Sequence, residues 1–103
     1  MRQVMVRYKV KPDRVEENEA LVRAVYEELH RTAPAGLRYA TFREDDGVSF
    51  VHVAQTEDGN PLSAVAAFAR FQDGIGERCD EAPVVTVLYE VGSYPRLGEE
   101  SPR

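Results

Sequence analysis

Residues 35–56, AGLRYATFREDDGVSFVHVAQT, decide the fold of this 103-residue chain. Two segments rich in aromatic and β-branched residues flank an Asp-Gly pair at 46–47, and such a pair is a strong hairpin signal. A type I′ turn, which needs a positive φ at both central residues, predicts that Thr41 pairs with His52 and places Tyr39 on the same face. We therefore expect two antiparallel strands that carry a histidine and a tyrosine side by side.

The chain before this stretch predicts one strand and one helix. Residues 3–10 alternate apolar and polar side chains, as a half-buried strand does. Residues 13–33 carry apolar side chains at helical spacing. Asp13 is expected to cap this helix, with Glu16 completing a capping box, and the Pro-Ala-Gly sequence at 34–36 is expected to end it.

The chain after this stretch predicts a second helix and a fourth strand. Asn60 and the proline that follows it favour a helix start, and the helix is expected to run to about Gly74, with a short further turn over 75–80. Residues 84–91 are rich in β-branched side chains and predict the last strand. The order βαββαβ is that of an α+β, ferredoxin-like domain, a four-stranded antiparallel sheet with two helices on one face.

The predicted hairpin has apolar side chains on both faces. One face carries Leu37, Tyr39, Phe50 and Ala54, and the other carries Ala40, Phe42, Val51 and Val53. An antiparallel sheet with one face in water alternates more sharply than this. Because two helices cover only one face, we expect the sheet of a second copy to cover the other, which makes a homodimer.

Composition restricts the classes of partner. The net charge is −5 and the pI about 5.0, which argues against nucleic acid and anionic membranes. There is no apolar run of the roughly 20 residues that a membrane span needs. The single Cys79 has no internal disulfide partner and is expected to be a packing residue, so a cytoplasmic location is the expectation. Residues 1–94 are expected to form one domain, and residues 95–103 a flexible tail.

Four segments resemble one protein family: HRTAPAGL at 30–37, FVHVAQTEDG at 50–59, AFARF at 67–71 and VGSY at 91–94. Together with the βαββαβ order they resemble the antibiotic-biosynthesis-monooxygenase-like proteins of the dimeric α+β-barrel superfamily, over roughly residues 3–94. The resemblance implies a homodimer with a ligand cavity between each sheet and its helices. Some members oxidise phenols or quinols with molecular oxygen and no cofactor. Others degrade haem, isomerise lactones or have no known activity.

The chain also departs from parts of this family. Haem-degrading members depend on a tryptophan and a helix-borne histidine, whereas this chain has no tryptophan and no histidine in its predicted second helix, so we set haem degradation aside. Many members carry a glutamate near the middle of the third strand, where this chain has Val53, Ala54 and Gln55. Catalytic residues therefore do not transfer directly from the family.

His52 is the sharpest candidate for chemistry. An ordinary imidazole takes up a proton near neutral pH, and forming a phenolate is the natural first step of cofactor-free oxygenation. Tyr39 and Tyr8 are candidates to orient the substrate hydroxyl or to relay that proton. The alternative is that His52 is a hydrogen-bonded sheet residue that packs at the dimer interface.

Arginines and phenylalanines are the other candidates for binding. Arg38 and Arg43 have the forked guanidinium that binds a carboxylate or an enolate, although strand arginines more often form ion pairs. Phe50, Phe68 and Phe71 are candidates to line an aromatic pocket, although core packing is the alternative.

The resemblance implies a cofactor-independent monooxygenase-like protein that acts on a small aromatic or quinol-type compound. Two histidines 22 positions apart and one distant cysteine match no metal-ligand spacing, so no metal is expected, and the resemblance implies that no other cofactor is needed. The alternatives are a non-catalytic small-molecule-binding domain and a purely structural dimerisation domain on the same fold. Both ligand-based hypotheses require a cavity of roughly 300 Å³ or more with convergent polar groups.

Overall fold

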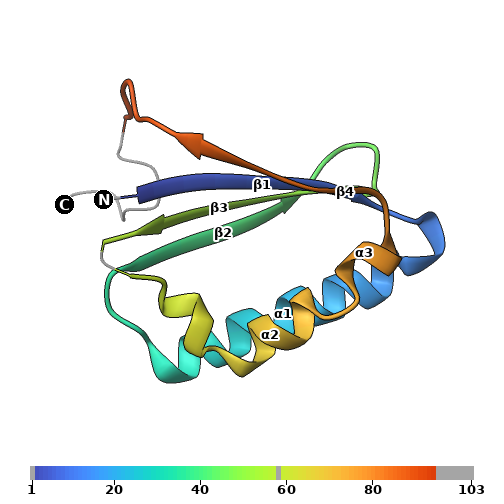
Figure 1. Cartoon of the computed structure of the whole chain (residues 1–103), viewed down its shortest axis with the longest axis horizontal. Helices are drawn as coiled ribbons and strands as arrows, with labels where there is room; N and C mark the ends of the chain where they lie inside the picture. The colour runs from blue at the N-terminus through green and yellow to red at the C-terminus, as the bar shows by residue number, and fades with distance from the viewer. Residues whose placement is uncertain (1, 58, 95–103) are drawn as a thin grey trace.

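A computed structural model of the chain describes residues 2–57 and 59–94 (Figure 1). The strands are β1 (Arg2–Val10), β2 (Leu37–Arg43), β3 (Ser49–Thr56) and β4 (Cys79–Leu88). The helices are α1 (Val15–Thr32), α2 (Ala66–Gln72) and α3 (Ile75–Arg78), with 3-10 turns η1 (Pro12–Arg14) and η2 (Pro61–Ala64). The strands form one antiparallel sheet in the order β2-β3-β1-β4, which confirms the predicted ferredoxin-like fold.

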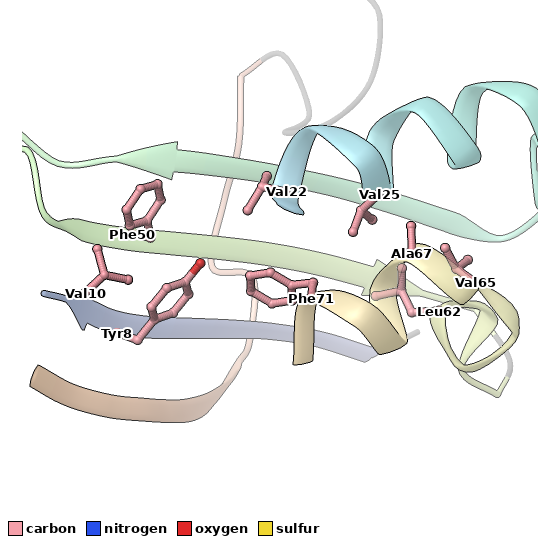
Figure 2. Packing of buried hydrophobic residues seen from close by; sticks show 9 residues of the cluster. All are labelled: Tyr8, Val10, Val22, Val25, Phe50, Leu62, Val65, Ala67 and Phe71. Atoms are coloured by element: carbon pink, nitrogen blue, oxygen red, sulfur yellow. The ribbon is translucent and has the colours of Figure 1, made fainter. Parts of the chain in front are cut away.

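All three α-helices lie on the same side of the sheet (Figure 1). The core fills the space between the two layers and combines apolar side chains from β1, β3, α1 and α2 with others from the segment that precedes α2. Figure 2 shows its nine buried members, which are Tyr8, Val10, Val22, Val25, Phe50, Leu62, Val65, Ala67 and Phe71. The opposite face of the sheet has no covering element within the described residues.

The hairpin register is as predicted. Thr41 pairs with His52, and Tyr39 with Ala54. Because strand side chains alternate, Tyr39, Thr41 and His52 share the face of the sheet that looks towards the helices. The sheet thereby brings the predicted histidine and tyrosine under the helical layer.

The turn of the hairpin differs from the predicted type I′ turn. Gly47 has a φ of 77°, but Asp46 does not have a positive φ, and the Gly47 N–H donates to the Glu44 carbonyl at 3.0 Å. The Asp46 carboxylate accepts hydrogen bonds from the backbone N–H groups of Val48 and Ser49, at 3.0 and 2.8 Å. The Ser49 hydroxyl also donates to this carboxylate, at 2.5 Å. This bond and the two backbone bonds stabilise a longer loop and lower the pKa of Asp46 to about 2. Compared with the predicted two-residue turn, the loop has one more residue on each side. The pairing of β2 with β3 is therefore the same as predicted.

The first helix begins later than predicted. Asp13 lies in η1, and α1 starts at Val15 without a side-chain hydrogen bond at its N-cap, Arg14, so the predicted capping box is wrong. Arg14 instead pairs with Glu17 at 2.6 Å in the first turn. At the other end, Ala33 adopts a left-handed φ of 45°, and its N–H donates to the Leu29 carbonyl at 2.7 Å.

The predicted second helix is divided into η2 and α2. Val65 between them is extended, with a φ of −93° and a ψ of 110°. The Glu28 carboxylate of α1 accepts hydrogen bonds from the N–H groups of Ala66 and Ala67, at 3.2 and 2.9 Å, and so caps α2 from another helix. The predicted Asn60 cap is confirmed, since its side chain accepts a hydrogen bond from the Leu62 N–H at 3.2 Å.

The last strand begins at Cys79, five residues before the predicted start, and ends at Leu88. Its first residues pair with the end of β1, where Val10 faces Cys79 across two register shifts. Because β4 is an edge strand, its exposed Asp80 and Glu81 are tolerated there. Residues 95–103, the predicted tail, lie outside the described residues, and the domain boundary at residue 94 stays a prediction. No helix in residues 2–57 and 59–94 is long and apolar enough to cross a membrane.

Candidate functional site

His52 lies under the helices with both ring nitrogens in hydrogen bonds. Its Nε2 is 2.8 Å from the Tyr8 hydroxyl, and its Nδ1 is 2.6 Å from the Tyr39 hydroxyl and 3.1 Å from the Thr41 hydroxyl. The imidazole is 4% exposed. Strands β1, β2 and β3 each supply one or more of these groups, so the sheet itself positions them. The site faces the helices of its own chain rather than the uncovered side of the sheet.

The hydrogen bonds continue from Tyr8 into the helical layer. Asn18 of α1 donates its amide N–H to the Tyr8 hydroxyl at 2.9 Å, and Arg78 at the end of α3 donates its Nε–H to the Asn18 side-chain oxygen at 3.2 Å. Asn18 is completely buried and Arg78 is 2% exposed. Arg78 also donates to the carbonyls of Phe71 and Asp73. Within the described residues, no buried side-chain nitrogen or oxygen lacks a partner.

Burial controls the protonation of these groups. It lowers the pKa of His52 to about 4, because the imidazolium loses its hydration. It raises the pKa of both Tyr8 and Tyr39 well above the usual value for a phenol, although the Asn18 amide acts in the opposite direction on Tyr8. At neutral pH, His52 is therefore a neutral imidazole and both tyrosines keep their protons.

A cavity of about 640 Å³ opens between the sheet and the segment that contains η2, α2 and α3. The hydrogen-bonded groups of Tyr8, Tyr39 and His52 line it from the sheet, and further polar lining comes from Arg2, Thr56, Asn60 and Gln72. Much of the remaining surface is apolar and comes from β1, β3, η2, α2, α3 and β4. It includes Val4, Val6, Ala54, Leu62, Phe68, Phe71, Ile75, Pro83 and Val85. The cavity exceeds the 300 Å³ that a small-molecule site requires, and Tyr8, Tyr39 and His52 converge within it.

The structure brings five of the predicted site residues to this cavity: Tyr8, Tyr39, His52, Phe68 and Phe71. Phe50 stands behind them, with its ring stacked on that of Tyr8 at a centroid distance of 5.6 Å, and does not line the cavity. Arg38 lies on the opposite face of the sheet, since it alternates with Tyr39 along β2. Arg43 forms an ion pair with Glu19 of α1 at 3.1 Å.

Sequence reasoning missed two residues of this network. Asn18 sits four residues before Val22 on the apolar side of α1, and a polar residue at such a position is a detectable signal of a buried hydrogen bond. Arg78 had no such signal, because its burial depends on the turn that α3 makes between α2 and β4. No group of three or more metal-ligating side chains occurs in the part of the chain that the structure describes.

Comparison with known proteins found similarity in structure only. No protein-family model matches the chain. No curated protein matches it either. Solved structures, in contrast, match over nearly the whole chain.

Three of these structures illustrate the match. An antibiotic biosynthesis monooxygenase is 23% identical, with a TM-score of 0.71 over 89% of this chain and 100% of that chain. PA3566 from Pseudomonas aeruginosa is 21% identical, with a TM-score of 0.70 over 88% of this chain and 94% of that one. A mutant of SnoaB, a cofactor-independent oxygenase from Streptomyces nogalater, is 16% identical, with a TM-score of 0.66 over 92% and 97% of the two chains.

The chain thus has the fold of the antibiotic-biosynthesis-monooxygenase-like proteins, which confirms the resemblance seen in its sequence. At these identities the similarity establishes the fold. Function has to be inferred from the residues that line the cavity, because one fold serves many functions.

Proposed function

We propose that this protein is a cofactor-independent monooxygenase-like enzyme for a small aromatic or quinol-type compound. The observation that carries the proposal is the cavity of about 640 Å³ into which the sheet brings the hydrogen-bonded set Tyr8, His52 and Tyr39. Support also comes from the shared fold with SnoaB, which is described as a cofactor-independent oxygenase.

The lining suits a flat, mainly apolar ligand with one polar edge. Phe68 and Phe71 offer aromatic faces, with their rings 6.0 Å apart, and Val6 and Ala54 form the apolar floor on the sheet. The hydrogen-bonded set would contact the hydroxyl or carbonyl oxygen of the ligand. A ring of this kind buries its apolar area while its oxygen keeps a hydrogen-bond partner.

The proposed reaction needs only the substrate and oxygen. A phenol and O₂ give a quinone and one water, so the substrate supplies the electrons and the protein supplies no redox group. Reaction with oxygen is easiest from the phenolate. The substrate would release its proton to bulk water before it binds, and Tyr39 and His52 would hold the anion in place. The apolar lining would exclude bulk water from this anion and from the intermediate that follows.

A non-catalytic small-molecule-binding domain is the second candidate. The observation that favours it is the state of His52: both of its nitrogens are already hydrogen-bonded, and its pKa of about 4 makes it a weak base at neutral pH. A binder needs the same cavity and the same hydrogen bond to a ligand oxygen, but no proton transfer.

We also propose that the protein works as a homodimer through the uncovered face of the sheet. Phe42 of β2 and Val84 of β4 are 56% and 63% exposed on that face. Aromatic and aliphatic side chains left in water on one face favour association with a second sheet. A purely structural dimerisation domain would share this face but would not need the cavity.

Oxygen uptake separates these candidates. The wild-type protein would be mixed with a panel of naphthols and hydroquinones, with protein-free blanks to measure spontaneous oxidation. An enzyme consumes oxygen above the blank, and Tyr39→Phe and His52→Ala lose most of that rate. The matched control is Tyr89→Phe, since Tyr89 is 86% exposed and does not line the cavity. Saturable binding without oxygen uptake would support the binder, and neither binding nor uptake would contradict both.

A further inference from the structure

We propose that Arg78 sets the direction of the hydrogen bonds that run through Asn18, Tyr8 and His52, and thereby makes Tyr39 a hydrogen-bond donor to a ligand oxygen. Arg78 is then a positioning residue, remote from the ligand, that decides which ligand chemistry the cavity accepts. The part about the ligand rests on the proposed function. The direction of the hydrogen bonds is a property of the free protein and can be tested without a ligand.

The first step is the contact between Arg78 and Asn18. A guanidinium has donors and no acceptor, so the Asn18 atom 3.2 Å from the Arg78 Nε must be the amide oxygen. Two further bonds, to the carbonyls of Phe71 and Asp73, hold the guanidinium in place, and its carbon lies 5.4 Å from the centre of the Phe71 ring. Arg78 therefore determines which way the Asn18 amide is turned.

The second step follows from that orientation. With its oxygen turned to Arg78, Asn18 presents its NH₂ group to the Tyr8 hydroxyl at 2.9 Å, so the hydroxyl accepts. The remaining described partner of this hydroxyl is the His52 Nε2, at 2.8 Å. Tyr8 is 1% exposed, which leaves no solvent to take its proton. Tyr8 therefore donates to Nε2, and Nε2 is an acceptor without a hydrogen.

The third step fixes the tautomer of His52. A neutral imidazole carries one N–H, so an unprotonated Nε2 places the hydrogen on Nδ1. The Nδ1–H then donates to the Tyr39 hydroxyl oxygen at 2.6 Å, with the Thr41 hydroxyl oxygen at 3.1 Å as a second acceptor. Thr41 is held in turn by the Tyr26 hydroxyl, 2.7 Å away.

The last step concerns the ligand. Because the Tyr39 oxygen accepts from His52, its own proton can go either to the neighbouring Thr41 hydroxyl, its other hydrogen-bond partner, or to a ligand oxygen in the cavity that Tyr39 lines. The raised pKa of Tyr39 keeps this proton in place at neutral pH. The site would therefore favour a phenolate or a carbonyl oxygen, which accepts, over a neutral hydroxyl that has to donate.

Nitrogen-15 NMR of the wild-type protein tests the direction of the chain. Two-bond correlations between the ring protons and nitrogens of His52 show which nitrogen carries hydrogen, and His30→Gln removes the other histidine from the spectrum. His30 is exposed on α1 and takes no part in the network. We expect a neutral His52 with hydrogen on Nδ1 at pH 7. Hydrogen on Nε2, or on both nitrogens, would overturn the proposal.

Asn18→Asp is the variant that should reverse the chain. The new carboxylate has nearly the same shape, still accepts from Arg78, and cannot donate to Tyr8. Tyr8 must then donate to the carboxylate, accept from Nε2–H, and leave Nδ1 as an acceptor. We expect the shifts of the two His52 nitrogens to exchange, a change that mere loosening of the structure does not produce. A folded variant with hydrogen still on Nδ1 would contradict the proposal, and if the variant fails to fold, the wild-type spectrum decides.

A binding experiment tests the part of the proposal that concerns the ligand. It uses 4-nitrophenol, whose phenolate absorbs visible light. The wild type should bind the phenolate in preference to the phenol, and Asn18→Asp should bind the phenolate roughly 10-fold more weakly or worse, as expected for loss of a hydrogen bond to a charged group. Equal binding of the phenolate by both proteins would refute donation by Tyr39. Absence of binding to a wild type that has the expected tautomer would count against the proposed function and leave the hydrogen-bond direction intact.

Discussion

The two faces of the sheet belong to the same strands, but their side chains differ in how deeply they are buried. On β1 and β3, the face towards the helices buries Tyr8, Phe50 and His52 to 4% exposure or less, whereas Val85 of the edge strand β4, on the same face, is 62% exposed. The opposite face leaves Phe42 and Val84 more than half exposed. Both faces carry apolar side chains in alternation, so hydrophobicity alone does not tell them apart.

The difference lies in whether each face is completed by the chain itself. The helix-facing side has its own covering layer, in which Asn18 and Arg78 meet the polar groups of the sheet. The uncovered side has apolar area and no such layer within the described residues. This difference supports the two proposals made above, a small-molecule site on the helix-facing side and a second copy of the chain on the other.

The largest expected effect is on stability, from the helix-facing side. Phe71→Ala should lower the free energy of unfolding by about 3–5 kcal/mol, because it opens a cavity among rings that contact Tyr8, His52 and Phe68. The matched variant on the other face is Phe42→Ala, compared at a protein concentration where the wild type is monomeric. Urea denaturation measures the free energy of unfolding of both variants. An equal loss in Phe42→Ala and Phe71→Ala would contradict the difference between the two faces.

Acid should destabilise the protein through His52. Its folded pKa of about 4 lies below the ordinary 6.5, so the unfolded chain binds this proton first. The sign is therefore a loss of stability as the pH falls from about 6.5 to about 4, in total about 3 kcal/mol for a group this buried. Denaturation experiments across this pH window should show the loss of stability in the wild type and not in His52→Gln. The window lies largely above the lowered pKa values of Asp46 and Glu28, so these carboxylates contribute little to the change.

On the uncovered face, a charge should prevent association. Phe42→Asp would place an unpaired carboxylate against the second sheet, and we expect a dissociation constant for the dimer at least roughly 100-fold higher than in the wild type. Sedimentation at micromolar concentrations measures it, with Glu27→Asp on the exposed side of α1 as the control. A wild-type protein that sediments as a monomer would contradict the dimer outright.

The smallest expected effect is the loss of stability when Tyr8→Phe removes one buried hydroxyl group. Tyr8→Phe should cost about 1–3 kcal/mol of stability, since it leaves the Asn18 N–H and the His52 Nε2 without their partner in a buried site. Tyr89→Phe, on an exposed residue, should cost nothing measurable. Thermal unfolding of the pair checks this, and equal midpoints would mean that the network adds no stability.

The sequence predicted the fold well because its signals are local. Alternation in the strands, the Asp-Gly pair and the Asn60 cap all act over a few residues, and the register that joins Thr41 to His52 followed from them. The errors lie where distant contacts override local preference. The predicted second helix is divided at the extended Val65, and Glu28 of another helix caps the α2 that follows.

The site was only partly predictable for the same reason. Tyr39 and His52 share a hairpin face, which alternation shows, and Tyr8 is on the neighbouring strand. Arg78 reaches Asn18 across 60 positions of sequence, and nothing in the local pattern marks such a contact. Arg38 shows the converse: its chemistry suits an anion, but alternation puts it on the face away from the cavity.

The most direct test of the account is an NMR titration with 1-naphthol, a small aromatic alcohol, followed on both faces of the sheet at once. We predict saturable shifts of the His52 ring and of Ala54 and Phe71, which line the cavity, and no change at Phe42 or Val84. Shifts confined to Phe42 and Val84, or no shifts at any concentration that naphthol reaches in water, would contradict a ligand site between the sheet and its helices.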